Sequence, residues 1–437
     1  MIQDPHDEAF FRQMRECRDP YRRLGDCFHA VVGGPQSGLD IGCGIGLQTA
    51  RLQELGWDIR GAEYSPVAIE LREPGVEIMN IDLTLPPVAA SRKVACVICT
   101  ETGEHIPGIY SSEVAANVAA HATDFIIWSA AAPGQEWEGH INLQPPSYWL
   151  KRFRVLGWKL DEERTAKLRY LMQKHNAQHV LGKDNFCVLV PDGKPLHMTI
   201  TSTALNAERW IGTHLATVAS QTFIDYRHVI IDAKSTDQTA AVAQCEANAD
   251  PRLRVIENDT RLSALENCWR VWKDLPPEEV IVWLDGDDWL AHDKALEVVA
   301  HAYGGESEPW LTYGQFMFSD GEVGFASPYP IGARVRYDAW RATHLKTFRA
   351  GLVQQLTEND LKHGGAFIEL AIDKVIMWPL LEMAGQNYEC IYQVLSVYNY
   401  EASWAASKTH AQRQVELDMV ENLRTRAPKR PLTKRPW

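Results

Sequence analysis

The sequence predicts an α/β protein with two doubly wound domains in tandem. Short β-type runs alternate with helical stretches twice along the chain, and such alternation is typical of a parallel sheet with helices on both faces. The segment 191–196, which is rich in turn-forming residues, separates the two series. With 437 residues, 45% of them hydrophobic, the chain is long enough for two domains that each bury a core.

The composition sets limits on the partners of the chain. The formal net charge of -13 argues against a body built to neutralise nucleic-acid phosphates, so a small acceptor of modest charge fits better. The first ten residues lack a basic region followed by an apolar core, and no run of about 18 apolar residues could span a bilayer. We therefore expect a soluble, cytoplasmic protein with no transmembrane segment. The nine scattered cysteines suit a reducing compartment.

The first domain is expected at residues 37–190, after a helical cap at residues 1–36. Cys96 and Cys99 lie within an apolar run that is typical of a buried strand, so we interpret them as core residues and not as a redox or zinc pair. The predicted strands of this domain are Gly38–Gly42, Trp57–Glu63, Val94–Thr100, Asp124–Ser129 and Phe186–Val190.

The second domain is expected at residues 197–405, beyond the linker 191–196. Residues 406–437 are expected to form a C-terminal helix and a basic tail, and we interpret the tail as a solvated, disordered end. The predicted strands of the second domain are Met198–Ser202, His228–Asp232, Leu253–Glu257 and Val280–Leu284.

A glycine-rich turn follows the first predicted strand. Gly42, Gly44 and Gly46 have no side chain at the point where a strand leads into a helix, so the backbone there can approach a ligand closely. The next strand ends in Glu63, and Asp82 follows the third strand. A glycine-rich turn alone is weak evidence, because dinucleotide enzymes use a similar loop, but the two acids add specificity.

Together these features resemble the cofactor site of class I methyltransferases that depend on S-adenosylmethionine (SAM). The resemblance implies that the loop with Asp40 and the three glycines binds SAM. It also implies that Glu63 accepts hydrogen bonds from both ribose hydroxyls and that Asp82 lies beside the adenine. Residues 37–190 are therefore interpreted as a SAM-dependent methyltransferase domain with a Rossmann-like fold.

Two carboxylates and an imidazole follow the fourth predicted strand as Glu101, Glu104 and His105. In a helical turn the positions i, i+3 and i+4 project on one side, so these groups would converge. The motif resembles that of metal-dependent O-methyltransferases acting on small RNA or in ubiquinone synthesis, which implies a divalent cation held by these residues and His140. In methyltransferases without metal, the histidine is a general base or a packing residue, so His105 is also a catalytic candidate. The chain lacks the motif of enzymes that methylate base amino groups, which favours an oxygen target.

An apolar strand leads directly into Asp285, Asp287 and Asp288. Three adjacent carboxylates repel one another unless a cation lies among them, so the cluster predicts Mg²⁺ or Mn²⁺ bridging to a diphosphate. The segment resembles the DxD motif of family-2 glycosyltransferases of the GT-A fold. That resemblance implies metal ligation by the three aspartates, with Asp285 also contacting a nucleotide-sugar donor.

The surrounding pattern supports this resemblance. The segment 199–211, which includes Asn206, resembles the family's first strand and the loop that receives the nucleotide base. The segment 219–223 matches a helix end of the family, and Asp232 matches the acid that bonds the base or ribose. The family's second acid is Ala233 here, a departure that leaves the choice between a UDP-sugar and a GDP-sugar open.

A candidate general base stands at the start of a later predicted helix. Asp373 corresponds to the family's acid motif, and it would take the proton of an acceptor hydroxyl in an inverting transfer. Because Ile372 replaces the family's glutamate, Glu369 and Glu382 remain alternatives, as does a helix cap without chemistry. His344 either reaches the acceptor or the metal, or is a packed surface histidine.

The two resemblances imply a bifunctional transferase. One domain would transfer a sugar from a nucleotide-sugar to a glycan, glycolipid or glycoprotein acceptor, and the other would O-methylate a sugar hydroxyl. A first alternative is modification of nucleic acid, on a DNA base or an RNA 2′-hydroxyl. A second alternative makes one domain a non-catalytic recruitment module.

Overall fold

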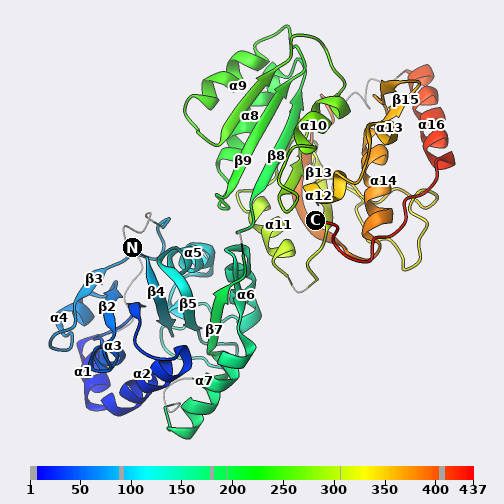
Figure 1. Ribbon diagram of the computed structural model, residues 1–437. Helices are drawn as coiled ribbons and strands as arrows, with labels where there is room; N and C mark the ends of the chain where they lie inside the picture. The colour runs from blue at the N-terminus through cyan, green and yellow to red at the C-terminus, as the bar shows by residue number, and fades with distance from the viewer. Residues whose placement is uncertain (1–6, 88–92, 178–181, 194, 306, 403–408) are drawn as a thin grey trace. The chain divides into compact units, whose positions relative to one another are not determined.

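The computed structural model describes residues 7–87, 93–177, 182–193, 195–305, 307–402 and 409–437. Parts of the predicted cap, linker and second-domain end, namely residues 1–6, 194 and 403–405, lie outside these ranges. The chain divides into two compact units, residues 1–195 and 196–437 (Figure 1). Both units are α/β with largely parallel sheets, so the predicted fold class is confirmed.

The first unit contains a seven-stranded sheet in the order β3-β2-β1-β4-β5-β7-β6. Its first five strands are parallel, whereas β7 runs antiparallel to β5 and β6. Because the strand order reverses between β1 and β4, the loops after these strands diverge and leave a crevice. The strands are β1 Ser37–Ile41, β2 Asp58–Glu63, β3 Ile78–Asn80, β4 Val94–Thr100, β5 Ala122–Ser129, β6 Trp158–Leu160 and β7 Cys187–Pro191.

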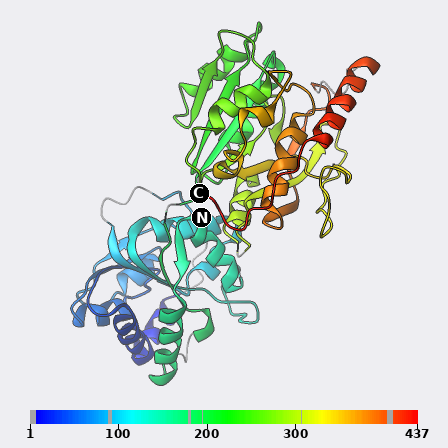
Figure 2. The same ribbon diagram turned by 45° about the vertical axis from the view of Figure 1, so that its right-hand side comes forward.

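Helices cover both faces of this sheet (Figure 1, Figure 2). Apolar side chains of α2, α3 and α7 pack on one face with Cys96, and those of α5 and α6 pack on the other with Cys99. Both cysteines are free thiols and fully buried, as the sequence predicted. The helices are α1 Glu8–Glu16, α2 Arg18–Val32, α3 Leu47–Glu54, α4 Pro66–Glu70, α5 Ser111–His121, α6 Pro146–Val155 and α7 Glu162–Lys174.

The second unit contains an eight-stranded sheet in the order β10-β9-β8-β11-β14-β13-β17-β12. The strands β8 to β11 are parallel, and the order reverses between β8 and β11, so a second crevice is expected at their carboxyl ends. The other strands, β12, β13, β14 and β17, had no counterpart among the predicted strands. The strands are β8 Met198–Ala204, β9 Tyr226–Asp232, β10 Leu253–Glu257, β11 Val280–Trp283, β12 Trp289–Leu290, β13 Leu311–Phe318, β14 Lys346–Arg349 and β17 Tyr388–Tyr398.

The helices of the second unit bury a large apolar core against this sheet, dominated by α10, α12 and α14. Among the described residues, no helix is both long enough and apolar enough to cross a bilayer. The helices are α8 Glu208–Ala219, α9 Thr239–Ala247, α10 Ala264–Trp272, α11 Ala295–Tyr303, α12 Ala350–Val353, α13 Glu358–Leu361, α14 Ile372–Ala384 and α16 His410–Thr425, and β15 Lys362–His363 pairs with β16 Ala366–Phe367.

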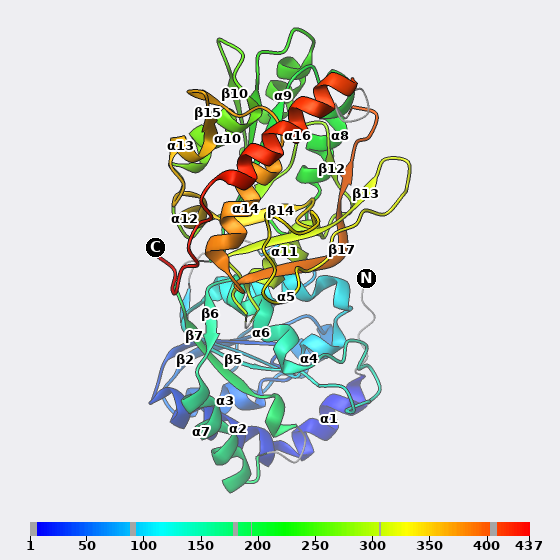
Figure 3. The same ribbon diagram turned by 90° about the vertical axis from the view of Figure 1, so that its right-hand side faces the viewer.

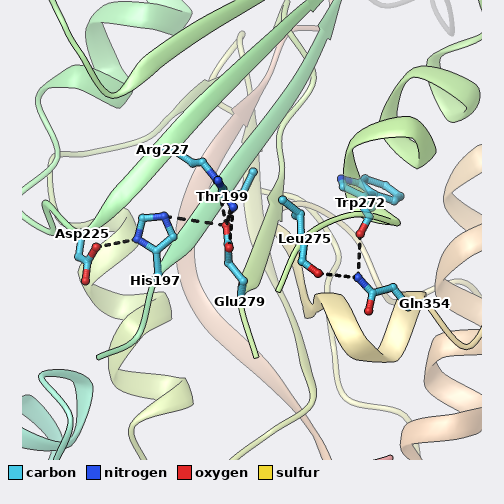
Figure 4. Close-up of polar contacts among 8 residues, drawn as sticks. All are labelled: His197, Thr199, Asp225, Arg227, Trp272, Leu275, Glu279 and Gln354. Atoms are coloured by element: carbon cyan, nitrogen blue, oxygen red, sulfur yellow. Dashed lines mark hydrogen bonds and ion pairs between the residues drawn. The ribbon is translucent and has the colours of Figure 1, made fainter. Parts of the chain in front are cut away.

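A buried carboxylate joins the amino ends of the parallel strands in the second unit (Figure 4). Glu279, just before β11, accepts hydrogen bonds from Arg227 Nη2 at 2.7 Å and 2.6 Å, and from the hydroxyl of Thr199. His197 bonds Asp225 at 2.6 Å beside them. A buried charge is tolerated when it is paired and hydrogen-bonded, so these contacts fix the strand ends opposite the second crevice.

The basic tail is packed, so the predicted solvated end is wrong (Figure 3). Trp437 packs on the apolar core with its ring centroid 5.7 Å from that of Trp310. Lys429 pairs with Asp360 at 2.7 Å, and Arg435 donates to the Glu308 carbonyl at 3.0 Å. The Lys, Arg and Pro residues of the tail therefore flank an apolar residue, Trp437, that packs on the core. The charged composition of the tail did not indicate this packing.

Replacement of Trp437 by alanine tests this packing. Because the ring covers core residues, we expect Trp437→Ala to lower the free energy of unfolding of the second unit by about 2 to 3 kcal/mol. Calorimetry of the full chain measures the change. Lys434→Ala, at an exposed position of the same segment, should change little. Equal, negligible effects of both variants would show a solvated tail.

Candidate functional sites at the strand ends

The first crevice is lined by the predicted glycine loop. Gly42, Gly44 and Gly46 all have positive φ angles, of 70°, 55° and 80°. A Cβ atom on Gly42 would lie 2.1 Å from Thr102 Oγ1, so only glycine fits at this position. A cavity of about 710 Å³ opens beside this loop, with Gly42 and Gly44 in its lining.

The two predicted cofactor acids also line this cavity. Glu63 accepts hydrogen bonds from the backbone N–H of Gly44 at 2.8 Å and of Tyr64 at 2.7 Å, so it ties β2 to the glycine loop. Asp82 accepts from Thr84 N at 2.9 Å. Asp40 is fully buried and accepts from Gln48 at 2.8 Å and Thr49 at 2.6 Å, so it anchors α3 rather than facing the cavity.

Three potential metal ligands gather in the same cavity. One ligand atom from each of Glu104, His105 and His140 lies within 4.8 Å of the others. Glu101, the fourth predicted ligand, is outside this set but lines the same cavity. The expected helical turn is instead a 3-10 helix at Gly103–His105, preceded by Glu101 in the left-handed region with φ 52°, so the i, i+3 geometry does not apply.

Backbone contacts hold the histidines of this set in place. The N–H groups of Ile141 and Asn142 donate to the Glu104 carbonyl at 2.9 Å and 3.0 Å, which brings His140 beside Glu104. His140 Nδ1 lies 2.7 Å from the Gln135 carbonyl, and His105 Nδ1 lies 3.1 Å from the Gly139 carbonyl. A carbonyl only accepts, so each Nδ1 donates a hydrogen bond there, which fixes the orientation of both rings.

The electrostatics of Glu104 fit a cation. Burial raises the pKa of Glu104 well above its ordinary value, and adjacent Glu101 raises this pKa further. Both carboxylate oxygens are buried, and neither has a partner of hydrogen-bond geometry within the described residues. A divalent ion among one carboxylate and two imidazoles would supply the missing partner. The residues present therefore fit a metal.

In the second crevice, the ends of β8 and β9 carry the predicted nucleotide-site residues. Asn206 follows β8 with φ 51° and accepts from Thr236 N at 2.8 Å. Asp232 ends β9, and its Oδ2 accepts from Ser235 N at 2.9 Å. Its Oδ1 is buried and unpaired among the described residues. Asp232 thus keeps one oxygen for a further donor.

The predicted acid cluster follows β11, and a histidine from a distant part of the chain lies beside it. Ligand atoms of Asp285, Asp288 and His344 lie within 4.8 Å of one another, whereas Asp287 is outside this set. Asp288 Oδ1 accepts from Asn399 N at 2.8 Å, and its buried Oδ2 lies 3.8 Å from His344 Nδ1.

The electrostatics of this cluster also fit a cation. Burial raises the pKa of Asp285 to about 7 and raises that of Asp288 well above its ordinary value. Burial, and then Lys346, lower the pKa of His344 to about 3, so the imidazole is neutral. Two carboxylates and a neutral imidazole are a donor set for Mn²⁺ or Mg²⁺.

A buried lysine that the sequence did not predict lies beside the acid cluster. Lys346, on β14, stands opposite Trp283 of β11 in the antiparallel register, and its side chain is 1% exposed. Its Nζ lies 2.7 Å from Asp373 Oδ1, while the Asp373 side chain remains 38% exposed. Against the effect of burial, the Lys346 ammonium lowers the pKa of Asp373 to about 2. Asp373 is therefore an oriented, ionised carboxylate at the edge of the acid cluster.

The two other candidates for the general base, Glu382 and Glu369, differ from Asp373 in their contacts. Glu382 forms a two-pronged ion pair with Arg336 and also accepts from Lys429 N at 2.8 Å, so both of its oxygens are used structurally. Glu369 is exposed and lines a separate cavity of about 440 Å³ beside α16. Of the three acids, Asp373 is the one that contacts Lys346 next to the cluster.

Residues 199–348 match the model of the glycosyl transferase family 2. A comparison with curated proteins finds no match. Among solved structures, the chain is similar to Staphylococcus aureus TarS in complex with UDP-GlcNAc, at 17% identity and a TM-score of 0.41, covering 52% of this chain and 66% of that chain. The chain covers 60% of another TarS structure.

Two further solved structures are similar to parts of the chain. The mannosyltransferase PcManGT from Pyrobaculum calidifontis, in complex with GDP-Man and Mn²⁺, shares 16% identity at a TM-score of 0.40, covering 54% of this chain and 66% of that chain. The magnesium protoporphyrin IX methyltransferase ChlM from Synechocystis, with bound SAH, shares 18% identity at a TM-score of 0.28, covering 33% of this chain and 75% of that chain.

Manganese binding tests both ligand sets. We expect the full chain to bind one Mn²⁺ ion at each of the two sets, because each gathers carboxylate oxygen and imidazole nitrogen atoms within 4.8 Å of one another. Glu104→Gln and Asp288→Asn should each remove one ion, as counted from free Mn²⁺ by electron paramagnetic resonance. The control Asp293→Asn, at an exposed acid, should remove none. A wild-type chain that leaves all Mn²⁺ free contradicts both assignments.

Proposed function

We propose that the chain is a bifunctional transferase. Its second domain transfers a sugar from a nucleotide-sugar to an acceptor hydroxyl, and its first domain transfers a methyl group from SAM to an oxygen, most simply a sugar hydroxyl of the same glycan. The observation that carries the proposal is the gathering of Asp285, Asp288 and His344 at the strand-order reversal of the segment that matches the glycosyltransferase family.

The nucleotide of the donor would bind across the ends of β8, β9 and β11. The unpaired Asp232 Oδ1 is placed to accept from a base or ribose, as either a UDP-sugar or a GDP-sugar would offer. Asp285, Asp288 and His344 would hold Mn²⁺ or Mg²⁺. When bound, the ion neutralises charge that develops on the departing diphosphate.

The acceptor proton is assigned to Asp373. Its carboxylate is partly exposed beside the acid cluster, so a hydroxyl that enters there can donate a hydrogen bond to it and pass its proton to it as the hydroxyl oxygen attacks. Lys346 fixes one oxygen at 2.7 Å and leaves the other for the acceptor. Attack from the side opposite the leaving group would invert the anomeric centre. The acceptor would be a glycan, glycolipid or glycoprotein.

The methyl donor would occupy the cavity of the first domain. The positive φ angles of Gly42, Gly44 and Gly46 provide a close backbone approach, and Glu63 and Asp82 present acceptors in the cavity lining. SAM, when bound, supplies an electrophilic methyl group. Glu104, His105 and His140, which line the same cavity, would hold a divalent ion and so fix the oxygen to be methylated.

Replacement of Asp373 tests the proposed base. Asp373→Asn keeps the size and the polar contact but cannot take a proton, so sugar transfer should fall by about 10² to 10⁴-fold. Binding of the nucleotide, measured by calorimetry with Mn²⁺ present, should stay unchanged. Glu369→Gln is the matched control, because Glu369 was the exposed alternative. A loss of transfer in Glu369→Gln alone would move the base to that residue.

Replacement of Gly42 tests the proposed cofactor loop. Gly42→Ala would place a methyl group against Thr102 at a strained φ of 70°, so SAM affinity should fall about tenfold or more. Isothermal titration measures it. Gly212→Ala, in helix α8 with no atom within 4 Å of an added Cβ, is the control and should not change SAM binding. Unchanged affinity in Gly42→Ala would show that SAM does not use this loop.

A further inference from the structure

Five aromatic side chains of the second unit lead outward from the acid cluster. We call Phe316, Phe318, Phe325, Tyr398 and Tyr400 the aromatic strip. The strip begins at His344, whose ring centroid lies 5.2 Å from that of Tyr398 and 5.6 Å from that of Phe316. It continues from Phe316 to Phe325 at 5.9 Å and from Phe318 to Tyr400 at 6.1 Å.

The strip changes from buried to exposed along its length. Phe316 is 3% exposed, whereas Phe325 and Tyr400 are 57% and 48% exposed. Single exposed apolar residues are common, but here the exposed rings are the outer members of a contact series that starts at the proposed metal ligand His344. The outer rings therefore present an apolar surface that is continuous with the proposed active site.

A backbone hydrogen bond joins the strip to the acid cluster. The N–H of Asn399, between Tyr398 and Tyr400, donates to Asp288 Oδ1 at 2.8 Å. The turn that carries two rings of the strip thus also holds a carboxylate of the cluster. In the neighbouring hairpin, Gly324 N donates to the Phe316 carbonyl at 2.8 Å.

Close packing in that hairpin requires a glycine. A Cβ atom on Gly324 would lie 2.2 Å from the Phe316 ring, so only glycine allows the hairpin that carries Phe325 to lie on this ring. The exposed Phe325 ring is therefore positioned by the fold and is not part of an unsupported loop.

We propose that the aromatic strip binds a pyranose ring of the acceptor, so that the acceptor of the proposed sugar transfer is itself a carbohydrate. This inference rests on the proposed function. A pyranose has an apolar C–H face and a rim of hydroxyls, and it suits a site that offers aromatic rings beside carboxylates. A hydrocarbon chain would use the rings but would gain nothing from the partly exposed carboxylate of Asp373, which Lys346 links to His344 at the start of the strip.

Binding of simple glycosides to the full chain tests the strip. The probes are the methyl pyranosides of glucose, galactose and mannose, with cyclohexanol as an apolar ring that lacks the hydroxyl rim. Saturation-transfer NMR in Mg²⁺ buffer reads contact with the sugar C–H protons. We expect at least one glycoside to bind the wild-type chain, and Phe325→Ala and Tyr400→Ala each to bind it about fivefold to tenfold more weakly.

Two control variants separate ring stacking from general effects. Tyr400→Phe keeps the ring and should bind like the wild type. Tyr392→Ala removes a tyrosine that is 71% exposed on β17 and outside the strip, so it should also bind like the wild type. Absence of glycoside binding to the wild type would overturn the proposal. So would binding by Phe325→Ala and Tyr400→Ala that is as strong as that of the wild type, or a cyclohexanol signal that matches the glycoside signals.

Release of nucleotide from UDP- and GDP-sugars by the same preparations distinguishes failure of the proposed sugar transfer from failure of the proposed acceptor site. A wild type that releases no nucleotide contradicts the proposed transfer. Normal release without any glycoside binding contradicts the aromatic strip alone.

Discussion

Both candidate sites depend on one constraint, which is that carboxylates buried at the carboxyl ends of parallel strands need a positive charge beside them. Burial raises the pKa of Glu104 in the first domain and of Asp285 and Asp288 in the second. In the second domain Lys346 supplies part of that charge from within the protein. The remaining unpaired oxygens, such as Asp288 Oδ2, account for the proposed need for a divalent ion.

The two domains meet this constraint with the same arrangement of elements. Each sheet reverses its strand order beside its first strand, and a residue with positive φ follows that strand, Gly42 in one domain and Asn206 in the other. The second strand then ends in an acid, Glu63 or Asp232. In each case the carboxylates of the potential metal site follow the strand on the other side of the reversal, at Glu104 or at Asp285. A crevice at the reversal receives loops from both sides, which is why these groups converge.

The sequence predicted the parts of both sites that are local. Glycines and acids at the ends of apolar runs can be recognised because a parallel sheet places all strand ends at one edge. The spacing of Glu101, Glu104 and His105 suggested a helical turn, and the structure has instead a left-handed backbone at Glu101. Lys346 could not be predicted, because its place opposite Trp283 depends on the antiparallel strand β14, which shows no motif. The packed tail was missed for a related reason, since Trp437 reaches a core built by distant helices.

The central proposal is that the acid cluster of the second domain, with a divalent ion, supports the transfer of a sugar from a nucleotide-sugar. Nucleotide release by the full chain tests this most directly, with a panel of UDP- and GDP-sugars in the presence of Mn²⁺ and after its removal by a chelator. The account predicts release from at least one donor that stops on chelation and returns when Mn²⁺ is restored. Release that continues unchanged without a divalent ion, or no release from any donor, would contradict it.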